Sequence, residues 1–332
     1  MKKDVLAPYA GPLEAFPASE EAPEGMEIME TGDDFDYFVQ FHKVSYERNG
    51  RSMHIDIMVP WATPIKPIPK GKKWPCLIYV QGNGFLATDT LWSMSTLVRI
   101  AEQGYVVASV EYGQEMGRGF AVEQLDDGEG MTPTVTEKEK KSVDIHNPNT
   151  IPALSEALDV KAAIRYLRLH AREYDIDETR IGLYGDSSGG HTALMAGITG
   201  DHALLPEEHP GVSCQVSCIV DWYGLTDMAK LPYYPCSVDG VTEKSITGMA
   251  LGGVRPLENP EIAQKANPIA YLDREKDCPP ILVMHGDRDP LVPFNQSVRL
   301  YEAMKELGKE VRLIKMKGGS HAYFGFKSEK SI

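Results

Sequence analysis

The sequence predicts an α/β fold with a mostly parallel central sheet and helices on both faces. Continuous apolar runs at residues 76–80, 106–112 and 279–285 have the composition of strands buried on both sides. Segments of helical length separate such runs, which is the alternation of βαβ units. A third observation is the motif Gly-Asp-Ser-Ser-Gly at residues 185–189, which lies between an apolar strand and a helical segment.

The composition bounds the class of protein. The 332 residues are 42% hydrophobic and 25% charged, which is ordinary for a globular chain that buries a large core, and we expect a single domain over residues 1–332. A formal net charge of −14 without any Lys/Arg-rich run disfavours nucleic acid and anionic membranes as partners. It favours a small neutral or cationic substrate.

Cofactor chemistry and location are also constrained. The five cysteines form no Cys-x-x-Cys motif, which disfavours a disulfide framework or a zinc site, and we expect no metal and no organic cofactor. The N-terminus lacks an apolar run long enough for a signal peptide, and no segment is long enough to span a bilayer. A cytoplasmic location is therefore the default expectation.

The N-terminal part of the chain predicts an arm followed by a hairpin. Residues 1–37 are rich in Pro, Glu and Ala without periodicity, which is typical of an irregular arm. Residues 38–46 and 52–59 are strand-like and flank Asn49-Gly50, a pair typical of hairpin turns. A connector rich in Pro and Lys then leads into the first buried strand.

Directly after that strand comes a loop, Gln-Gly-Asn-Gly-Phe at residues 81–85. Its glycines allow backbone N–H groups to approach a ligand closely, so we expect an oxyanion hole here, with Asn83 and Gly84 among the donors. A helix over residues 88–103 is predicted to follow. Residues 113–150 form a long segment rich in Gly and charge, which predicts an insertion near the active-site mouth, either an ordered lid or a mobile loop.

An amphipathic helix at residues 155–170 and a turn at 175–180 precede the motif at 185–189. That motif has the pattern of a nucleophile elbow, in which glycines permit a sharp strand-to-helix turn and expose the central side chain, Ser187. The dipole of the following helix favours negative charge, so the amide of Ser188 is a further candidate oxyanion donor. The hydroxyl of Ser188 is expected to pack or to cap the helix.

A serine hydroxyl is a weak nucleophile without a base, so the elbow predicts partners elsewhere in the chain. Asp287 and Asp289 follow a late buried strand, where a carboxylate is well placed to orient an imidazole. A glycine-rich loop after the last predicted strand carries His321, the expected base. The order serine, aspartate, histidine is that of the α/β-hydrolase fold and differs from the orders in chymotrypsin and subtilisin.

These motifs give the chain a family resemblance. It resembles α/β-hydrolase carboxylesterases of the hormone-sensitive-lipase and bimodular-feruloyl-esterase type in the loop at residues 81–85, in Asp-Trp-Tyr-Gly-Leu-Thr-Asp at 221–227 and in the pattern His-Gly-x-x-Asp-x-x-Val-Pro at 285–293. The position in this last pattern favours Asp289 over Asp287.

The chain departs from the family pattern in the loop. Gln81 stands where a His is usual, and Asn83 stands where a Gly is usual. Asn tolerates positive φ better than other non-glycine residues, so we expect the turn to survive. The Asn83 side chain either adds a donor to the hole or narrows the acyl site.

The resemblance also suggests where a substrate binds. Residues 228–263 match the position of a cap and are expected to wall the acyl pocket. Phe85, Trp222 and Tyr223 are candidate substrate contacts, with a core role as the alternative.

The sequence thus predicts a serine carboxylesterase for short-chain or aryl acyl esters, acting through an acyl-enzyme with Ser187, Asp289 and His321. The resemblance implies acetylated or feruloylated carbohydrates as substrates. An amidase or peptidase on the same fold and a non-catalytic ligand-binding homologue are the alternatives. The expected partner is a small-molecule ester, and association into homo-oligomers stays open.

Overall fold

The computed structural model describes residue 23 and residues 37–48, 50–62, 66–86, 88, 90–91, 93–113, 151–202, 211–237 and 239–322. The predicted arm at residues 1–37, apart from residues 23 and 37, lies outside the described residues, and so does the predicted insertion at 113–150, apart from Gly113.

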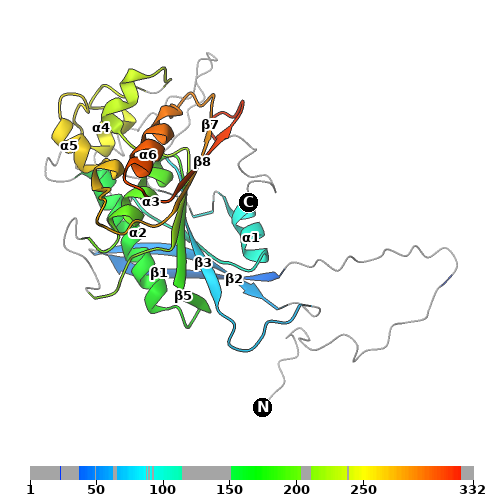
Figure 1. The fold of residues 1–332 in the computed structure, drawn as a ribbon. Coiled ribbons are helices and arrows are strands. Elements are labelled where there is room, and N and C mark those ends of the chain that lie inside the picture. Colours follow the sequence, from blue (N-terminus) through cyan, green and yellow to red (C-terminus); the bar gives the residue numbers. More distant parts are fainter. Residues whose placement is uncertain are drawn as a thin grey trace.

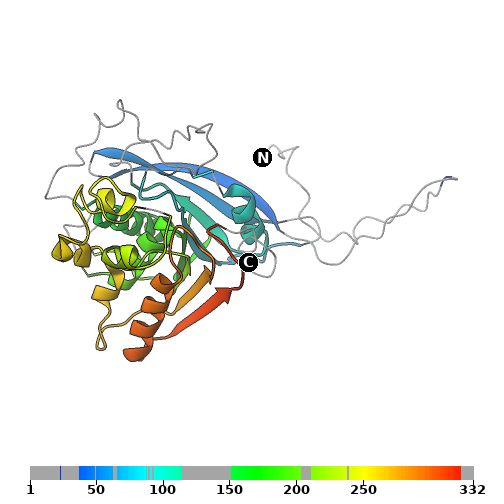
Figure 2. The same cartoon turned by 90° about the horizontal axis from the view of Figure 1, so that it is seen from above.

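A central sheet organises the described residues. Its strands are β1 Phe38–Arg48, β2 Arg51–Trp61, β3 Trp74–Val80, β4 Val106–Val110, β5 Ile176–Asp186, β6 Cys218–Trp222, β7 Ile281–Gly286 and β8 Val311–Met316. They lie in the order β1-β2-β4-β3-β5-β6-β7-β8, so that β1 and β8 form the two edges (Figure 2). β1 pairs antiparallel with β2, and β2 with β4, whereas the other neighbouring pairs are parallel. The predicted mostly parallel sheet is confirmed.

Helices cover both faces of this sheet. Those that pack on it in the described residues are α1 Met94–Glu102, α2 Pro152–Leu169, α3 Ser188–Thr199 and α6 Asn295–Glu306. α1 buries Leu97 against Tyr79 on one face, whereas Val160 of α2, Leu194 of α3 and Leu300 of α6 belong to the core on the other. Figure 1 shows α1 on the opposite side of the sheet from the other three. This arrangement leaves the carboxyl ends of the parallel strands open to loops, where sites form in such sheets.

The first two strands form the predicted hairpin. β1 and β2 are in register from Phe38 opposite Trp61 to Arg48 opposite Arg51, with two residues between the strands. Ile55 and Ile57 are fully buried, as their alternation predicts, but the intervening Asp56 is also buried. Met58, on the same face of β2 as Asp56, packs in the core beneath α1, whereas Ile55 and Ile57 pack in the core on the other face, so both faces of β2 are covered.

The helix predicted over residues 88–103 begins only at Met94. Thr90, which precedes this start, is held by the sheet instead, because its hydroxyl donates to the Asp56 carboxylate on β2. A tertiary hydrogen bond thus replaces the first turn that the local pattern favoured.

Two other boundaries differ from the sequence prediction. The helix predicted at 155–170 begins at Pro152, since the fixed φ of proline suits the first helical position. The turn predicted at 175–180 is mostly strand, because β5 begins at Ile176, which pairs with Trp74 of β3.

The region expected to be a cap consists of short elements. These are the 3₁₀ helix η3 Met228–Tyr233 and the helices α4 Ile246–Ala250 and α5 Pro260–Lys265, followed outside the region by the 3₁₀ helix η4 Pro268–Tyr271. Met228, Leu231 and Ala263 form a small core together with Phe85 and Val292. The segment therefore packs on the loops that follow β3 and β7, and its role as a wall of the acyl pocket stays a prediction.

Candidate active site

Ser187 stands at the turn between the end of β5 and the start of α3. Its backbone has φ 55° and ψ −126°, a left-handed region that non-glycine residues rarely occupy. A Cβ added at Gly185 would lie 2.3 Å from the Gly189 carbonyl oxygen, and one added at Gly189 would lie 2.1 Å from the Val80 carbonyl oxygen. The strained central residue and the collisions predicted for the flanking glycines are both present.

The structure brings together the three side chains predicted to act with one another. His321 Nε2 lies 3.0 Å from Ser187 Oγ, and His321 Nδ1 lies 2.7 Å from Asp289 Oδ2. Asp289 lies in the loop after β7, and His321 lies in the loop after β8. These distances permit a proton to pass between the hydroxyl and the imidazole while the carboxylate holds the ring.

Asp289 is a buried anion with many donors. Its side chain is fully buried, and its Oδ1 accepts from the amides of Leu291, at 2.8 Å, and Val292, at 2.9 Å. Burial raises the pKa of this carboxyl, but the hydrogen bonds from His285, His321 and the Val292 amide outweigh it, so the pKa lies well below its usual range. The group therefore stays ionised at neutral pH.

The rival carboxylate, Asp287, has another task. Its Oδ1 accepts from the Gly318 amide at 2.6 Å, and its own amide donates to the Met316 carbonyl. Asp287 thus ties the loop after β7 to the end of β8. Of the two candidates, Asp289 is the one whose carboxylate contacts His321.

The loop at residues 81–85 differs from its prediction in its backbone conformation. Positive φ occurs at Gly84 and Phe85, both 61°, and Asn83 is absent from the residues with positive φ, so the turn does not need the tolerance of Asn. The Asn83 amide donates to Ser188 Oγ at 2.9 Å. This amide is therefore engaged with the elbow, and the assignment of Asn83, Gly84 and Ser188 to the oxyanion hole stays a prediction.

Ser188 is the first residue of α3 and is fully buried. A first-turn amide has no acceptor within its own helix, so the Ser188 N–H is available at the positive end of the helix dipole. Its hydroxyl serves the loop through Asn83, which agrees with the expected packing role.

The three candidate substrate contacts are buried. Phe85 is 0%, Trp222 4% and Tyr223 1% exposed. Phe85 meets the edge of His191 at 5.2 Å between ring centroids, Trp222 packs on Tyr184, and Tyr223 lies 4.6 Å from the His321 ring. These side chains support the site from within and offer almost no surface to a substrate, which corrects the expectation of direct contact.

Sequence reasoning missed Asp186, the residue before Ser187. Its Oδ1 accepts from the Tyr79 hydroxyl at 2.7 Å and from the Gly82 amide at 3.0 Å. It therefore fastens the loop after β3 to the elbow. Its place next to the serine was the available signal, because a carboxylate at the end of a buried strand needs donors.

Asp221 is another buried carboxyl beneath the elbow. Its Oδ1 accepts from the Gly224 amide at 3.0 Å, and in the described part of the chain Oδ2 has no hydrogen-bond partner. Burial, with the charge of Asp186 adding, outweighs the Gly224 amide and raises the pKa of Asp221 to about 7.

Two features of the described residues bear on other functions. Within the described ranges, no group of three or more His, Cys, Asp or Glu side chains is arranged to hold a metal ion. Within the same ranges, no helix is long and apolar enough to cross a membrane.

Esterases recur among the known proteins that this chain resembles. The BD-FAE family model matches residues 142–304. Esterase LipQ of Mycobacterium tuberculosis is 24% identical over 289 residues, which is 86% of this chain and 58% of that protein. Esterase LipC of the same organism is 26% identical over 257 residues, 76% of this chain and 54% of that protein. The chain spans about half the length of the curated relatives it matches.

A solved structure also aligns with most of the chain. The truncated form of a carbohydrate esterase from gut microbiota has a TM-score of 0.63 at 25% identity, and the match covers 83% of this chain and 86% of that one. The likeness to this structure therefore extends over most of the fold.

Replacement of Gly189 should test the close packing of the elbow. Gly189→Ala places a methyl group against the Val80 carbonyl, where only backbone could yield, so we expect the free energy of unfolding to fall by about 2–4 kcal/mol in urea denaturation. Gly240→Ala is the control, because its nearest neighbour is the flexible end of Leu231, and it should cost less than about 1 kcal/mol. Equal losses in the two variants would contradict the packing argument.

Asp221 should make stability depend on pH. Between about pH 4 and 7 the unfolded chain releases a proton that the folded protein retains, so stability falls across this window and levels off above it. Asp221→Asn removes this penalty, whose upper limit is about 4 kcal/mol. The difference in melting temperature, variant minus wild type, should therefore rise from pH 4 to 7 and then stay constant. A difference that is independent of pH would refute the raised pKa.

Proposed function

We propose that this chain, which is an α/β-hydrolase of the BD-FAE-like esterase type, is a serine carboxylesterase that uses Ser187, His321 and Asp289. The observation that carries the proposal is the continuous hydrogen-bonding chain from the Ser187 hydroxyl through the His321 ring to the Asp289 carboxylate. The esterase relatives support the same activity.

In the proposed reaction, His321 Nε2 removes the proton from Ser187 Oγ as the oxygen attacks the ester carbonyl. The Ser–carbonyl bond forms and a tetrahedral oxyanion develops. His321 then returns the proton to the leaving alcohol, which departs and leaves an acyl-enzyme. Water, deprotonated by His321, attacks this ester, and His321 returns the proton to Ser187 Oγ as the bond to the acyl group breaks and the acid leaves. Asp289 stays ionised and holds the proton on His321 Nδ1.

The oxyanion requires donors that are in place before the reaction. We assign this role to the amides of Ser188 and Gly84, because the Asn83 amide is bonded to Ser188 Oγ. The first turn of α3 adds the positive end of a helix dipole. The same turn fixes Ser187, so nucleophile and donor move together.

The substrate class is inferred from the family resemblance and from the net charge. We propose short-chain or aryl acyl esters, with acetylated or feruloylated carbohydrates included, in keeping with the family resemblance and the carbohydrate esterase among the structural neighbours. The net charge of −14 disfavours polyanionic substrates. The cytoplasmic location stays a prediction.

A fluorophosphonate probe should label the wild type at Ser187. Ser187→Ala should abolish labelling and lower kcat for a p-nitrophenyl ester by at least about 10⁴-fold, because the nucleophile is gone. Ser188→Ala is the control: it keeps the nucleophile and should still be labelled, more slowly than the wild type because its hydroxyl no longer holds the Asn83 amide. An unlabelled wild type would favour a non-catalytic binding protein, and faster cleavage of a matched anilide than of the ester would favour an amidase.

The two aspartates after β7 offer a matched pair of variants. Asp289→Asn keeps the volume but removes the charge that holds the proton on His321 Nδ1, so kcat should fall by about 10³- to 10⁴-fold. Asp287→Asn retains an oxygen that accepts from the Gly318 amide and should change kcat by less than about 3-fold. Steady-state kinetics on the same ester measure both, and the reverse order would reassign the acid.

A further inference from the structure

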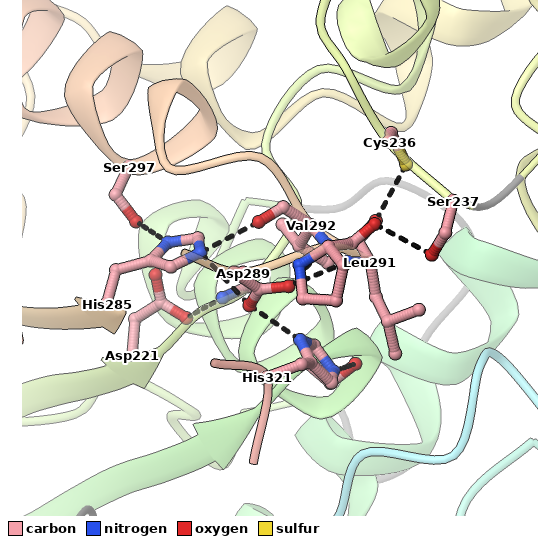
Figure 3. Close-up of polar contacts among 12 residues, drawn as sticks. Asp221, Cys236, Ser237, His285, Asp289, Leu291, Val292, Ser297 and His321 are labelled. Atoms are coloured by element: carbon pink, nitrogen blue, oxygen red, sulfur yellow. Dashed lines mark hydrogen bonds and ion pairs between the residues drawn. The ribbon is translucent and has the colours of Figure 1, made fainter. Parts of the chain in front are cut away.

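The Asp289 carboxylate lies between two imidazoles. Besides His321, the ring of His285 approaches it, with His285 Nε2 3.3 Å from Asp289 Oδ2. Figure 3 shows Asp289 joined by dashed lines to both rings, with Ser297 on the far side of His285. The side chain of His285 is fully buried, and it comes from the end of β7, four residues before Asp289.

The partners of His285 fix where its proton is. Nε2 lies 2.9 Å from the Val292 carbonyl oxygen, and a carbonyl only accepts, so Nε2 must carry a hydrogen. The same nitrogen lies 3.3 Å from Asp289 Oδ2, which is a second acceptor within reach of that N–H. Nδ1 lies 2.6 Å from Ser297 Oγ, whose hydroxyl can donate to it. The Val292 carbonyl thus selects the tautomer with the hydrogen on Nε2, and the Ser297 hydroxyl supplies the matching donor that holds the ring at Nδ1.

Packing holds the ring in this orientation. The Phe294 ring meets His285 edge-on at 5.5 Å, and the Tyr223 ring lies 6.3 Å away on the side toward the site. Tyr223 also contacts His321, so one aromatic ring packs near both imidazoles. A rotation of His285 would break the bonds at both of its nitrogens.

The two oxygens of the Asp289 carboxylate have different partners. Oδ1 is filled by the amides of Leu291 and Val292, and Oδ2 receives N–H groups from His285 and His321. If only the two amides held Oδ1, the carboxylate could still tilt and move Oδ2 relative to His321. The second imidazole sets that tilt and supports the ionised form.

We propose that His285, oriented by Ser297, is a positioning residue that aims the Asp289 carboxylate at His321. The inference rests on the proposed function, since it assigns His285 to the same reaction. His285 touches no substrate and acts through Asp289. A residue that only fills the core would stabilise the protein without affecting the bond between Asp289 and His321.

The test compares His285→Leu, which removes the donor, with His285→Gln, whose amide can donate from nearly the same position. We expect His285→Leu to lower kcat for a p-nitrophenyl ester by about 10- to 100-fold with KM changed less than about 2-fold. His285→Gln should recover kcat to within about 5-fold of the wild type. A folded His285→Leu variant within about 3-fold of the wild-type kcat would overturn the proposal, as would a Gln variant no better than Leu.

A second readout does not depend on turnover. The proton between His321 Nδ1 and Asp289 should give a low-field ¹H NMR resonance, assigned by its loss in Asp289→Asn. It should shift or broaden in His285→Leu and return in His285→Gln, and an unchanged resonance would refute the coupling. Wild-type probe labelling and hydrolysis report separately on the proposed function, so the two failures are distinguishable.

Ser297→Ala decides the question if His285→Leu does not fold. This variant keeps the imidazole and removes only the group that orients it, and circular dichroism should be unchanged. We expect kcat to fall by about 3- to 10-fold at constant KM, with a shift of the low-field resonance. An unchanged kcat and resonance would overturn the role of the Ser297–His285 pair.

Discussion

The contact on which the site depends is the approach of the first turn of α3 to the end of β3. Gly189 lies against the Val80 carbonyl so closely that no side chain fits between them. This approach places Ser187 beside the loop at residues 81–85 and forces the serine into a left-handed backbone conformation. The backbone packed on both sides of the turn enforces this conformation of Ser187, so the strain is retained. Strained conformations persist at functional sites in this way. Nucleophile, helix dipole and loop amides are therefore positioned by one contact.

Asp221 and Asp289 illustrate how donors decide the charge of a buried carboxyl. Both are removed from water, which by itself raises a carboxyl pKa. Asp221 has one amide donor and a neighbouring negative charge, and its pKa rises to about 7. Asp289 has two amides and two imidazoles, and its pKa falls below the usual range. The same residue type thus titrates near neutral pH at one buried position and stays anionic at the other, according to what faces it.

Features that depend on local pattern were predictable. The elbow glycines, the hairpin about residues 49–50 and the candidate triad follow from residue types at fixed spacings. The late start of α1 was not, because a hydrogen bond from Thr90 to a distant strand decides it. Nor was the engagement of the Asn83 amide, since it requires Ser188 Oγ to lie 2.9 Å away across the elbow. Periodicity describes a segment alone, whereas these features depend on which segments meet.

Both residues that flank Ser187 in the elbow motif bind the loop after β3. Asp186 holds the loop after β3 through the Gly82 amide, and Ser188 holds it again through the Asn83 amide. These two hydrogen bonds, one to the residue before Ser187 and one to the residue after it, therefore fix the loop that brings Gly84 toward the site. A loop tied at only one point would swing, and a donor displaced by a fraction of an ångström loses much of its effect on a developing charge. The flanking polar residues hold the loop rigid against the elbow, so its amides need little reorganisation when the oxyanion forms.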